Sequence, residues 1–206
     1  MELKQVFEKR RSVNFFDSQK TISEDLIRNI YDRAKLAPSS FNLQPWKFIL
    51  VREPENKKKL RAAALNQPKV EEASATLILL ADKEGYKEID KILDDQIAKG
   101  YMPTDKKSLY AGMTEKLYGS AIASRGFAMR NAGLFAMSFM LAAKDSGVDT
   151  HPMDGFEQDK VKEAFNIPER YEVAMLIAVG YHDDKKTLLP RLNRKNFEDA
   201  VIKEGF

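Results

Sequence analysis

The chain of 206 residues contains no cysteine and only two histidines. Without thiol groups it can form no disulfide, no iron–sulfur cluster and no thiolate zinc site. The two imidazoles, His151 and His182, are too few for a histidine-based metal site and lack the His-x-x-x-His spacing of a helical one. The sequence therefore predicts no bound metal.

Long apolar runs and glycine-rich phosphate loops are also missing. The longest mostly apolar run, residues 132–143, is far shorter than the ~20 residues that a membrane-spanning helix requires, and residues 1–5 form no apolar signal region. Neither G-x-G-x-x-G nor G-x-x-x-x-G-K-[ST] occurs, which argues against a Rossmann site and a P-loop nucleotide triphosphatase. We expect a cytoplasmic protein that does not associate with membranes.

A large excess of charge of one sign is absent too. The 34 basic and 31 acidic residues are interspersed and leave a net charge of only +3. The overall charge therefore does not favour a nucleic-acid partner. A local basic pocket that binds an anion is still compatible with this charge balance. The length, with 43% hydrophobic residues, suits one globular unit, so we expect a single domain over residues 1–206.

The hydrophobic periodicity indicates several helices around a few strands. Because strands and helices do not alternate regularly, the pattern favours an α+β fold over an α/β fold. The segment 86–118 is charged and reads as helical or irregular. Helices are expected near residues 3–7, 22–36, 54–65, 120–144 and 156–165, and strands over 46–51, 75–81 and 173–179, of which 75–81 reads as central.

The helix expected over residues 120–144 is apolar on nearly all sides. A helix of this kind is buried, either in the core of one chain or in an interface between chains. Its phenylalanines and methionines, among them Phe127, Phe135 and Met137, exceed what one face of a small core needs. Both interpretations remain open from the pattern itself.

The first group of candidate functional residues is Lys9-Arg10-Arg11-Ser12. Adjacent guanidinium groups and a hydroxyl can bind a phosphate, because the planar forks match its oxygens and the opposite charges strengthen the bonds. A run of this kind is more often a solvated helix face. The group becomes informative only together with others.

The second group lies between a helix and a strand, in residues 37–48. Ser39, Ser40 and Asn42 offer hydroxyl and amide groups suited to a polyol or a phosphate, next to Trp46 as a possible aromatic wall. The competing interpretation is a Pro38 helix stop followed by a turn, with Trp46 in the core. The segment by itself favours neither, although a tryptophan such as Trp46 is more often a core residue than a platform for a ligand.

Two further groups precede or follow expected helices. Asn66, Gln67 and Lys69 could read the polar edge of a planar heterocycle and stabilise its anionic form, although an exposed polar loop is the simpler interpretation. Later, His151-Pro152-Met153-Asp154-Gly155 ends in a glycine that lets backbone N–H groups approach a ligand. His151 in isolation is more often structural than catalytic.

Taken in order along the chain, these groups resemble the FMN-dependent nitroreductase family. The resemblance rests on Arg10-Arg11-Ser12, the Pro-Ser-x-x-Asn-x-Gln-Pro-Trp element at 38–46, Asn-Gln-Pro-Lys at 66–69, Pro-Met-Asp-Gly-Phe at 152–156 and a late arginine, Arg194. The second element is quite specific, and the others gain weight from their order. The match spans nearly the whole chain.

The resemblance implies a central mixed sheet flanked by helices and an intertwined homodimer with two FMN molecules at its interface. One subunit would bind the phosphate and ribityl chain through its N-terminal and late arginines, and the partner subunit would approach the same flavin through residues 38–42. The cofactor-binding residues that it implies are Arg10, Arg11, Ser12, Asn14, Pro38, Ser39, Ser40, Asn42, Asn66, Gln67, Lys69, Met153, Asp154, Gly155 and Arg194.

The chain departs from the family pattern at two of these positions. Family members often carry a basic residue where this chain has Asn14, near the flavin N1–O2 edge, and many carry Glu at the position of Asp154. Loss of a cation near N1 would lower the flavin potential unless Lys69 supplies the charge. Arg191 and Lys195 also compete with Arg194 as the late phosphate ligand.

The implied activity is hydride transfer from NADH or NADPH to FMN and then, in a ping-pong cycle, to a small-molecule acceptor such as a nitroaromatic compound or a quinone. The flavin would supply the chemistry, so no catalytic side chain is expected. Dehalogenases and other specialised oxidoreductases share the fold, and residues 86–118 do not select among them. A flavin-binding or redox-sensing module with little turnover is the alternative from another class.

Overall fold

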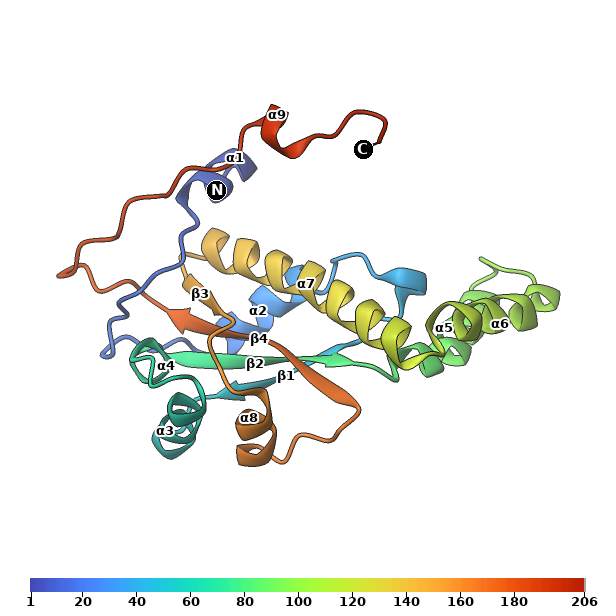
Figure 1. Cartoon of the computed structure of the whole chain (residues 1–206), viewed down its shortest axis with the longest axis horizontal. Coiled ribbons are helices and arrows are strands. Elements are labelled where there is room, and N and C mark those ends of the chain that lie inside the picture. Colours follow the sequence, from blue (N-terminus) through green and yellow to red (C-terminus); the bar gives the residue numbers. More distant parts are fainter. Residues whose placement is uncertain (206) are drawn as a thin grey trace.

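The computed structural model of the chain describes residues 1–205. A four-stranded sheet lies at its centre, in the order β1 (Trp46–Val51), β2 (Ala75–Asp82), β4 (Tyr171–Gly180) and β3 (Asp149–Met153). Helices cover both faces of this sheet (Figure 1). The expected α+β class and the three expected strands are therefore confirmed, with β2 buried along its whole length as a central strand requires.

The sheet corrects one expectation about strand direction. All three pairings among the four strands are antiparallel, whereas a mixed sheet was expected. Within residues 1–205, parallel pairing is limited to an isolated bridge between Ser12 and Thr150. Strand β3 itself was not expected, because Pro152 and His151 are not typical strand residues. Proline is tolerated there because β3 is the last strand of the sheet, and beyond it lies only the isolated bridge at Thr150 among residues 1–205.

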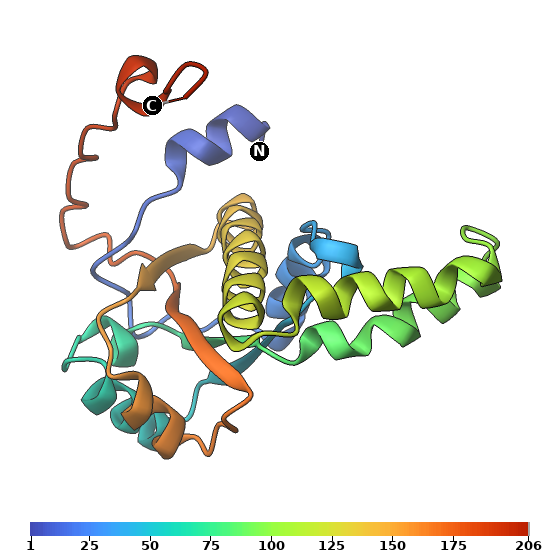
Figure 2. The same cartoon turned by 45° about the vertical axis from the view of Figure 1, so that its right-hand side comes forward.

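The helices lie close to the expected ranges and form two layers. One layer contains α1 (Leu3–Lys9), α2 (Glu24–Ala34) and α7 (Ala121–Asp145), and the other contains α3 (Pro54–Ala63), α4 (Lys69–Glu72) and α8 (Gln158–Ala164). The charged middle of the chain is helical and includes η2 (Gly85–Glu88), α5 (Ile89–Ala98), η3 (Thr104–Lys106) and α6 (Lys107–Tyr118). Figure 2 shows α5 and α6 projecting together away from the sheet.

The alternation of side chains along β2 divides the core into two clusters. Leu77, Leu79 and Ala81 face the cluster under α2 and α7, while Ile78 and Leu80 face the cluster over α3, α4 and α8. This follows from the period of two in a strand, which sends successive side chains to opposite faces. The sheet is buried on both faces and provides a rigid base for the segments that leave its ends.

Helix α7 is buried on one side only. Phe127, Phe135 and Phe139 are fully buried, whereas Ile122 is 90% exposed, Leu134 44% and Met137 37%. A β-carbon at Gly133, on the open side, would have no neighbour within 4 Å. Within residues 1–205, α7 therefore presents a mainly apolar, closely approachable face that no other element covers. Among the described residues, no helix combines the length and apolar content needed to cross a membrane.

Candidate functional site

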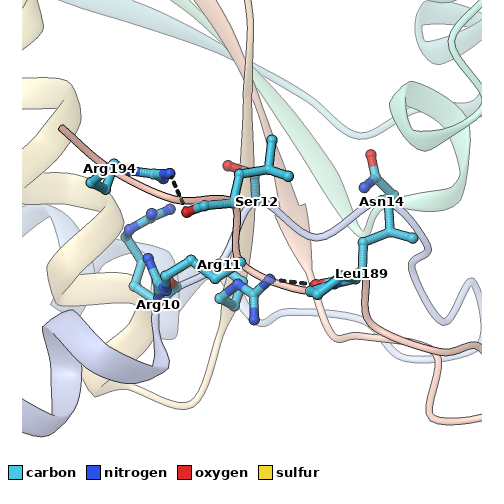
Figure 3. A pocket seen from close by; sticks show the side chains of 9 residues that line it. Arg10, Arg11, Ser12, Asn14, Leu189 and Arg194 are labelled. Atoms are coloured by element: carbon cyan, nitrogen blue, oxygen red, sulfur yellow. Dashed lines mark hydrogen bonds between the residues drawn. The ribbon is translucent and has the colours of Figure 1, made fainter.

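The N-terminal segment after α1 and the extended C-terminal segment before α9 (Phe197–Ala200) lie side by side and enclose a cavity of about 440 Å³ (Figure 3). Four of the residues that line the cavity are arginines. Two come from each segment, so the late arginine and the N-terminal pair meet as expected. The lining consists of Arg10, Arg11, Ser12, Asn14, Leu189, Pro190, Arg191, Leu192 and Arg194.

Backbone pairing with β3 positions the N-terminal side of this cavity. Helix α1 ends at Lys9, and the chain continues in extended conformation. The Val13 N–H donates to the Thr150 carbonyl at 3.1 Å, and the Val13 side chain is buried in the core. Ser12 and Asn14, on either side of this anchor, are thereby held at the edge of the sheet.

The electrostatics of the cavity favour an anion. Burial of the Arg10 guanidinium lowers its pKa, and the nearby positive charges of Arg191, Arg194 and Arg11 lower it further. Cations that repel one another in a partly buried site are stabilised when a multivalent anion enters between them. A phosphate group, with its two negative charges and several acceptor oxygens, fits this cavity.

The third and fourth groups of expected residues also come together. The Gln67 side chain donates to the Gly155 carbonyl at 2.8 Å, and Lys69 Nζ donates to Gln67 Oε1 at 3.4 Å. A β-carbon at position 155 would lie 3.3 Å from Gln67 Nε2, so glycine permits this close approach. Asn66 adopts a positive φ of 56°, which turns the chain sharply after α3.

His151 links these groups to the N-terminal segment. Its Nδ1 lies 2.9 Å from the Val13 carbonyl oxygen, and the ring is half-buried. Burial lowers the pKa of His151, and the charge of Lys69 lowers it further, which places Lys69 near the same strand. The first, third and fourth groups therefore form one continuous polar strip along the β3 edge, from the arginine cavity to Lys69.

Backbone donors are available at the far end of this strip. Within residues 1–205, the N–H groups of Asp154 and Gly155 donate to no protein acceptor, although the Asp154 carbonyl accepts from Phe156 at 3.0 Å. The Met153 side chain is buried in the core cluster on the α3 side of the sheet. Met153 can therefore reach a ligand only through its backbone, while Asp154 and Gly155 present free donors.

The second group is held by a different set of contacts. Ser39 Oγ accepts from the Gln44 N–H at 3.0 Å, and the Ser40 N–H donates to Asn131 Oδ1 of α7 at 3.0 Å. Phe41 and Asn42, in the short helix η1 (Ser40–Asn42), both have positive φ, an uncommon conformation that surrounding contacts must support. The segment is thus a rigid, strained turn with exposed polar groups.

Trp46 does not form an aromatic wall for a ligand. Its ring is buried and stacks on Phe135 with 5.1 Å between ring centroids. The interpretation of Trp46 as a core residue is therefore correct.

The structure does not bring the second group to the strip within one chain. In Figures 1 and 2 the turn at residues 38–42 lies on one side of α7, and the N- and C-terminal segments that line the arginine cavity lie on the other. The sequence identified most of the cavity, but Leu189, Pro190 and Leu192 were not expected there. No local pattern distinguishes these three from an ordinary extended tail.

Comparison with known proteins identifies the class. Residues 7–181 match the model of the nitroreductase family. The chain is 36% identical over 204 residues to MhqN of Bacillus subtilis, which is named as a candidate NAD(P)H nitroreductase, with 95% of each chain covered. The chain therefore belongs to the nitroreductase family, and the resemblance noted in its motifs is confirmed.

Solved structures agree with this assignment. The crystal structure of Bacillus subtilis ydfN superposes with a TM-score of 0.93 at 34% identity and covers 98% of both chains. A second neighbour, from Exiguobacterium sibiricum, was solved in complex with FMN and superposes with a TM-score of 0.87 at 30% identity, covering 99% of this chain and 98% of that one. The fold described above is the nitroreductase fold.

Proposed function

We propose that the chain is an NAD(P)H-dependent flavin oxidoreductase that uses FMN to reduce nitroaromatic compounds, quinones or similar small acceptors in a ping-pong cycle. The observation that carries this proposal is the polar strip, which joins a cavity of four arginines to Lys69 and two free backbone N–H groups. Relatives whose names are NAD(P)H nitroreductase and NADH dehydrogenase support the proposal that a reduced nicotinamide is the electron donor. The FMN complex of a neighbour supports the cofactor.

The residues of the strip fit the chemical groups of FMN. Arg10, Arg11 and Arg194 supply cations for the phosphate, and Ser12 and Asn14 supply polar groups for the ribityl chain and its junction with the ring. Bound FMN would accept hydride from the nicotinamide at N5 and return it to the acceptor. The protein binds and orients both partners, so we assign no catalytic side chain.

The ring of the cofactor would lie at the other end of the strip. Asn66, Gln67 and Lys69 provide amide groups and a cation for its polar pyrimidine edge. The free N–H groups of Asp154 and Gly155 would donate to its N5–O4 side. Since only backbone donors act there, aspartate in place of the family's frequent glutamate is compatible with this role.

A homodimer would complete the site. The segment with Pro38, Ser39, Ser40 and Asn42 lies across α7 from the segments that line the arginine cavity, so we infer that a flavin held by the strip does not meet it within one chain. A second copy can supply them, and the uncovered apolar face of α7 offers an isologous surface for that copy. Each chain, residues 1–206, then acts as one FMN-binding domain that contributes half of each of two sites.

The purified protein tests this function directly. We expect a yellow protein that oxidises NADH or NADPH rapidly when a quinone or nitroaromatic compound is added. Visible absorbance would establish the flavin, and steady-state rates at varied donor and acceptor would give the parallel reciprocal plots of a ping-pong cycle. A yellow protein without turnover would instead support a flavin-binding module, and a colourless protein that takes up no FMN would contradict the proposal.

Replacing Lys69 with methionine should lower the reduction potential of bound FMN by about 30 mV, or roughly 1.4 kcal/mol for two electrons. In the proposed site Lys69 supplies the positive charge at the polar ring edge, because the side chain of Asn14 is uncharged. A positive charge there favours the reduced cofactor, which is more negative than the oxidised one. A dye-coupled redox titration measures the shift. Lys69→Arg, which keeps the charge, is the matched control, and an unchanged potential in Lys69→Met would place the stabilising charge elsewhere.

A further inference from the structure

The C-terminal segment that closes the arginine cavity has little structure of its own. Among the described residues, 187–196 belong to no helix or strand, and their backbone N–H groups donate to no backbone carbonyl. The segment is instead joined to the N-terminal segment by guanidinium–carbonyl hydrogen bonds. Arg11 of the N-terminal segment donates to the Leu189 carbonyl, as Figure 3 shows. Two residues further along the C-terminal segment, Arg191 donates in the opposite direction, to carbonyls of the N-terminal segment.

Arg191 binds the end of α1. Its Nη2 donates to the Glu8 carbonyl at 2.9 Å and to the Arg10 carbonyl at 2.7 Å. Carbonyls in the last turn of a helix lack intrahelical partners and carry the negative end of the helix dipole, so a guanidinium is a favourable partner for them. Arg191 therefore connects two segments that lie more than 180 residues apart in the sequence.

Arg194 makes contacts of a different kind. Its Nη1 donates to the carbonyls of Leu192 and Asn193, which immediately precede it in the same segment. These bonds shape the segment locally and do not attach it to the rest of the molecule. Arg194 also lines the cavity and lies close enough to Arg10 to affect its charge, so its position depends on where the whole segment lies.

Electrostatic repulsion opposes the attachment of the C-terminal segment to the N-terminal segment. Docking the C-terminal segment places the guanidinium groups of Arg191 and Arg194 beside those of Arg10 and Arg11, and like charges at short range repel. Without an anion, this repulsion favours release of the segment. The hydrogen bonds of Arg191 can offset this repulsion, because two charge-assisted bonds to backbone carbonyls stabilise the docked position of its guanidinium.

We propose that Arg191 is a positioning residue of the phosphate site: it fastens the C-terminal segment to the end of α1, and thereby holds Arg194 where it binds the phosphate. The identity of the phosphate as that of FMN rests on the function proposed above. The two arginines have separate roles, one toward the protein backbone and one toward the ligand. Lys195, which does not line the cavity, has neither role.

Mobility of the segment in the FMN-free protein tests the fastening. Since the chain has no cysteine, Asn193→Cys creates a single attachment point for a nitroxide spin label, whose spectrum reports motion between the two arginines. We expect Arg191→Ala to increase the label's mobility, while Arg191→Lys, whose ammonium can donate to both carbonyls, remains close to the parent. The charge-matched control Lys195→Ala, at a residue that does not line the cavity, should leave it unchanged. Equal mobility in Arg191→Ala and Lys195→Ala would overturn the proposal.

Affinity for FMN tests the link to the phosphate. Arg194→Ala should weaken binding roughly ten- to a hundredfold, the cost of one charge-assisted contact. Arg191→Ala should weaken it by a similar factor, and the double variant should be little weaker than Arg191→Ala, because both changes remove the same contact. Flavin fluorescence titration measures the constants, and Arg191→Lys should restore most of the affinity.

The two measurements separate the possible failures. Losses that multiply in the double variant would show that Arg191 binds the phosphate itself and would overturn the proposal. If the parent protein bound no FMN, the proposed function would fail, while the spin-label spectra would still decide whether Arg191 fastens the segment.

Discussion

Replacing Arg10 with glutamate is expected to reduce the affinity for FMN by a factor of about a thousand or more without unfolding the protein. Burial of Arg10 and the charges of its three cationic neighbours in the cavity lower its pKa. A carboxylate there replaces attraction to the phosphate by repulsion. At an effective dielectric constant near 20, one charge pair at 4 Å contributes about 4 kcal/mol, so the lost attraction alone accounts for about a thousandfold and the repulsion adds to it.

The same change should not destabilise the flavin-free protein. A glutamate at position 10 would face Arg191, Arg194 and Arg11, so it would relieve their mutual repulsion. We therefore expect an equal or higher thermal unfolding temperature for the FMN-free variant. Loss of FMN binding together with retained stability would separate a ligand-binding role from a structural one.

Two controls make the Arg10→Glu experiment specific. Lys9→Glu changes the same charge on the adjacent residue, which is exposed and does not line the cavity, so it should alter FMN affinity only slightly. Riboflavin lacks the phosphate, so its weaker binding should be little affected by either variant. An equal loss of FMN and riboflavin affinity in Arg10→Glu would show that the cavity does not hold the phosphate.

Replacing Leu134 with aspartate should dissociate the proposed dimer and remove the flavin from a correctly folded monomer. Leu134 is 44% exposed on the uncovered side of α7, beside Met137. In an isologous interface the change occurs twice, and each buried, unpaired carboxylate costs about 3 kcal/mol or more. The dimer dissociation constant should rise by roughly 10⁴.

Sedimentation velocity and the ratio of flavin to protein test this expectation together. Because Leu134 is partly exposed in the single chain, the monomer should retain its fold, which far-ultraviolet circular dichroism would show. Leu109→Asp, on the exposed side of α6, introduces the same charge away from α7 and should remain dimeric and yellow. A yellow, dimeric Leu134→Asp protein would contradict the proposed interface.

Much of the fold could be predicted because it follows from local patterns. The apolar runs Trp46–Val51 and Ala75–Asp82 form strands, and helices α2 and α7 lie within a few residues of their expected limits. Helix-capping side chains and prolines act within a few residues of the ends they define. The buried role of Trp46 likewise follows from the chemistry of its side chain.

The remaining features depend on contacts between distant residues. Strand β3 contains a proline and is recognisable only from its pairing with β4, and the antiparallel direction of the sheet follows from how the strands are connected in space. The role of Arg191 depends on carbonyls at Glu8 and Arg10, at the opposite end of the chain. No short window of sequence contains such information.

Sequence patterns were sufficient to predict the α+β class, the approximate limits of three strands and the long helices and, through the order of the motifs, the family and its candidate site residues. The grouping of those residues is visible only in the folded chain. The tertiary structure joins the first, third and fourth groups along β3 and separates them from residues 38–42 by α7. Motif order is a local property, whereas a binding site arises from long-range packing, and the packing of this one chain brings together only part of the expected residues.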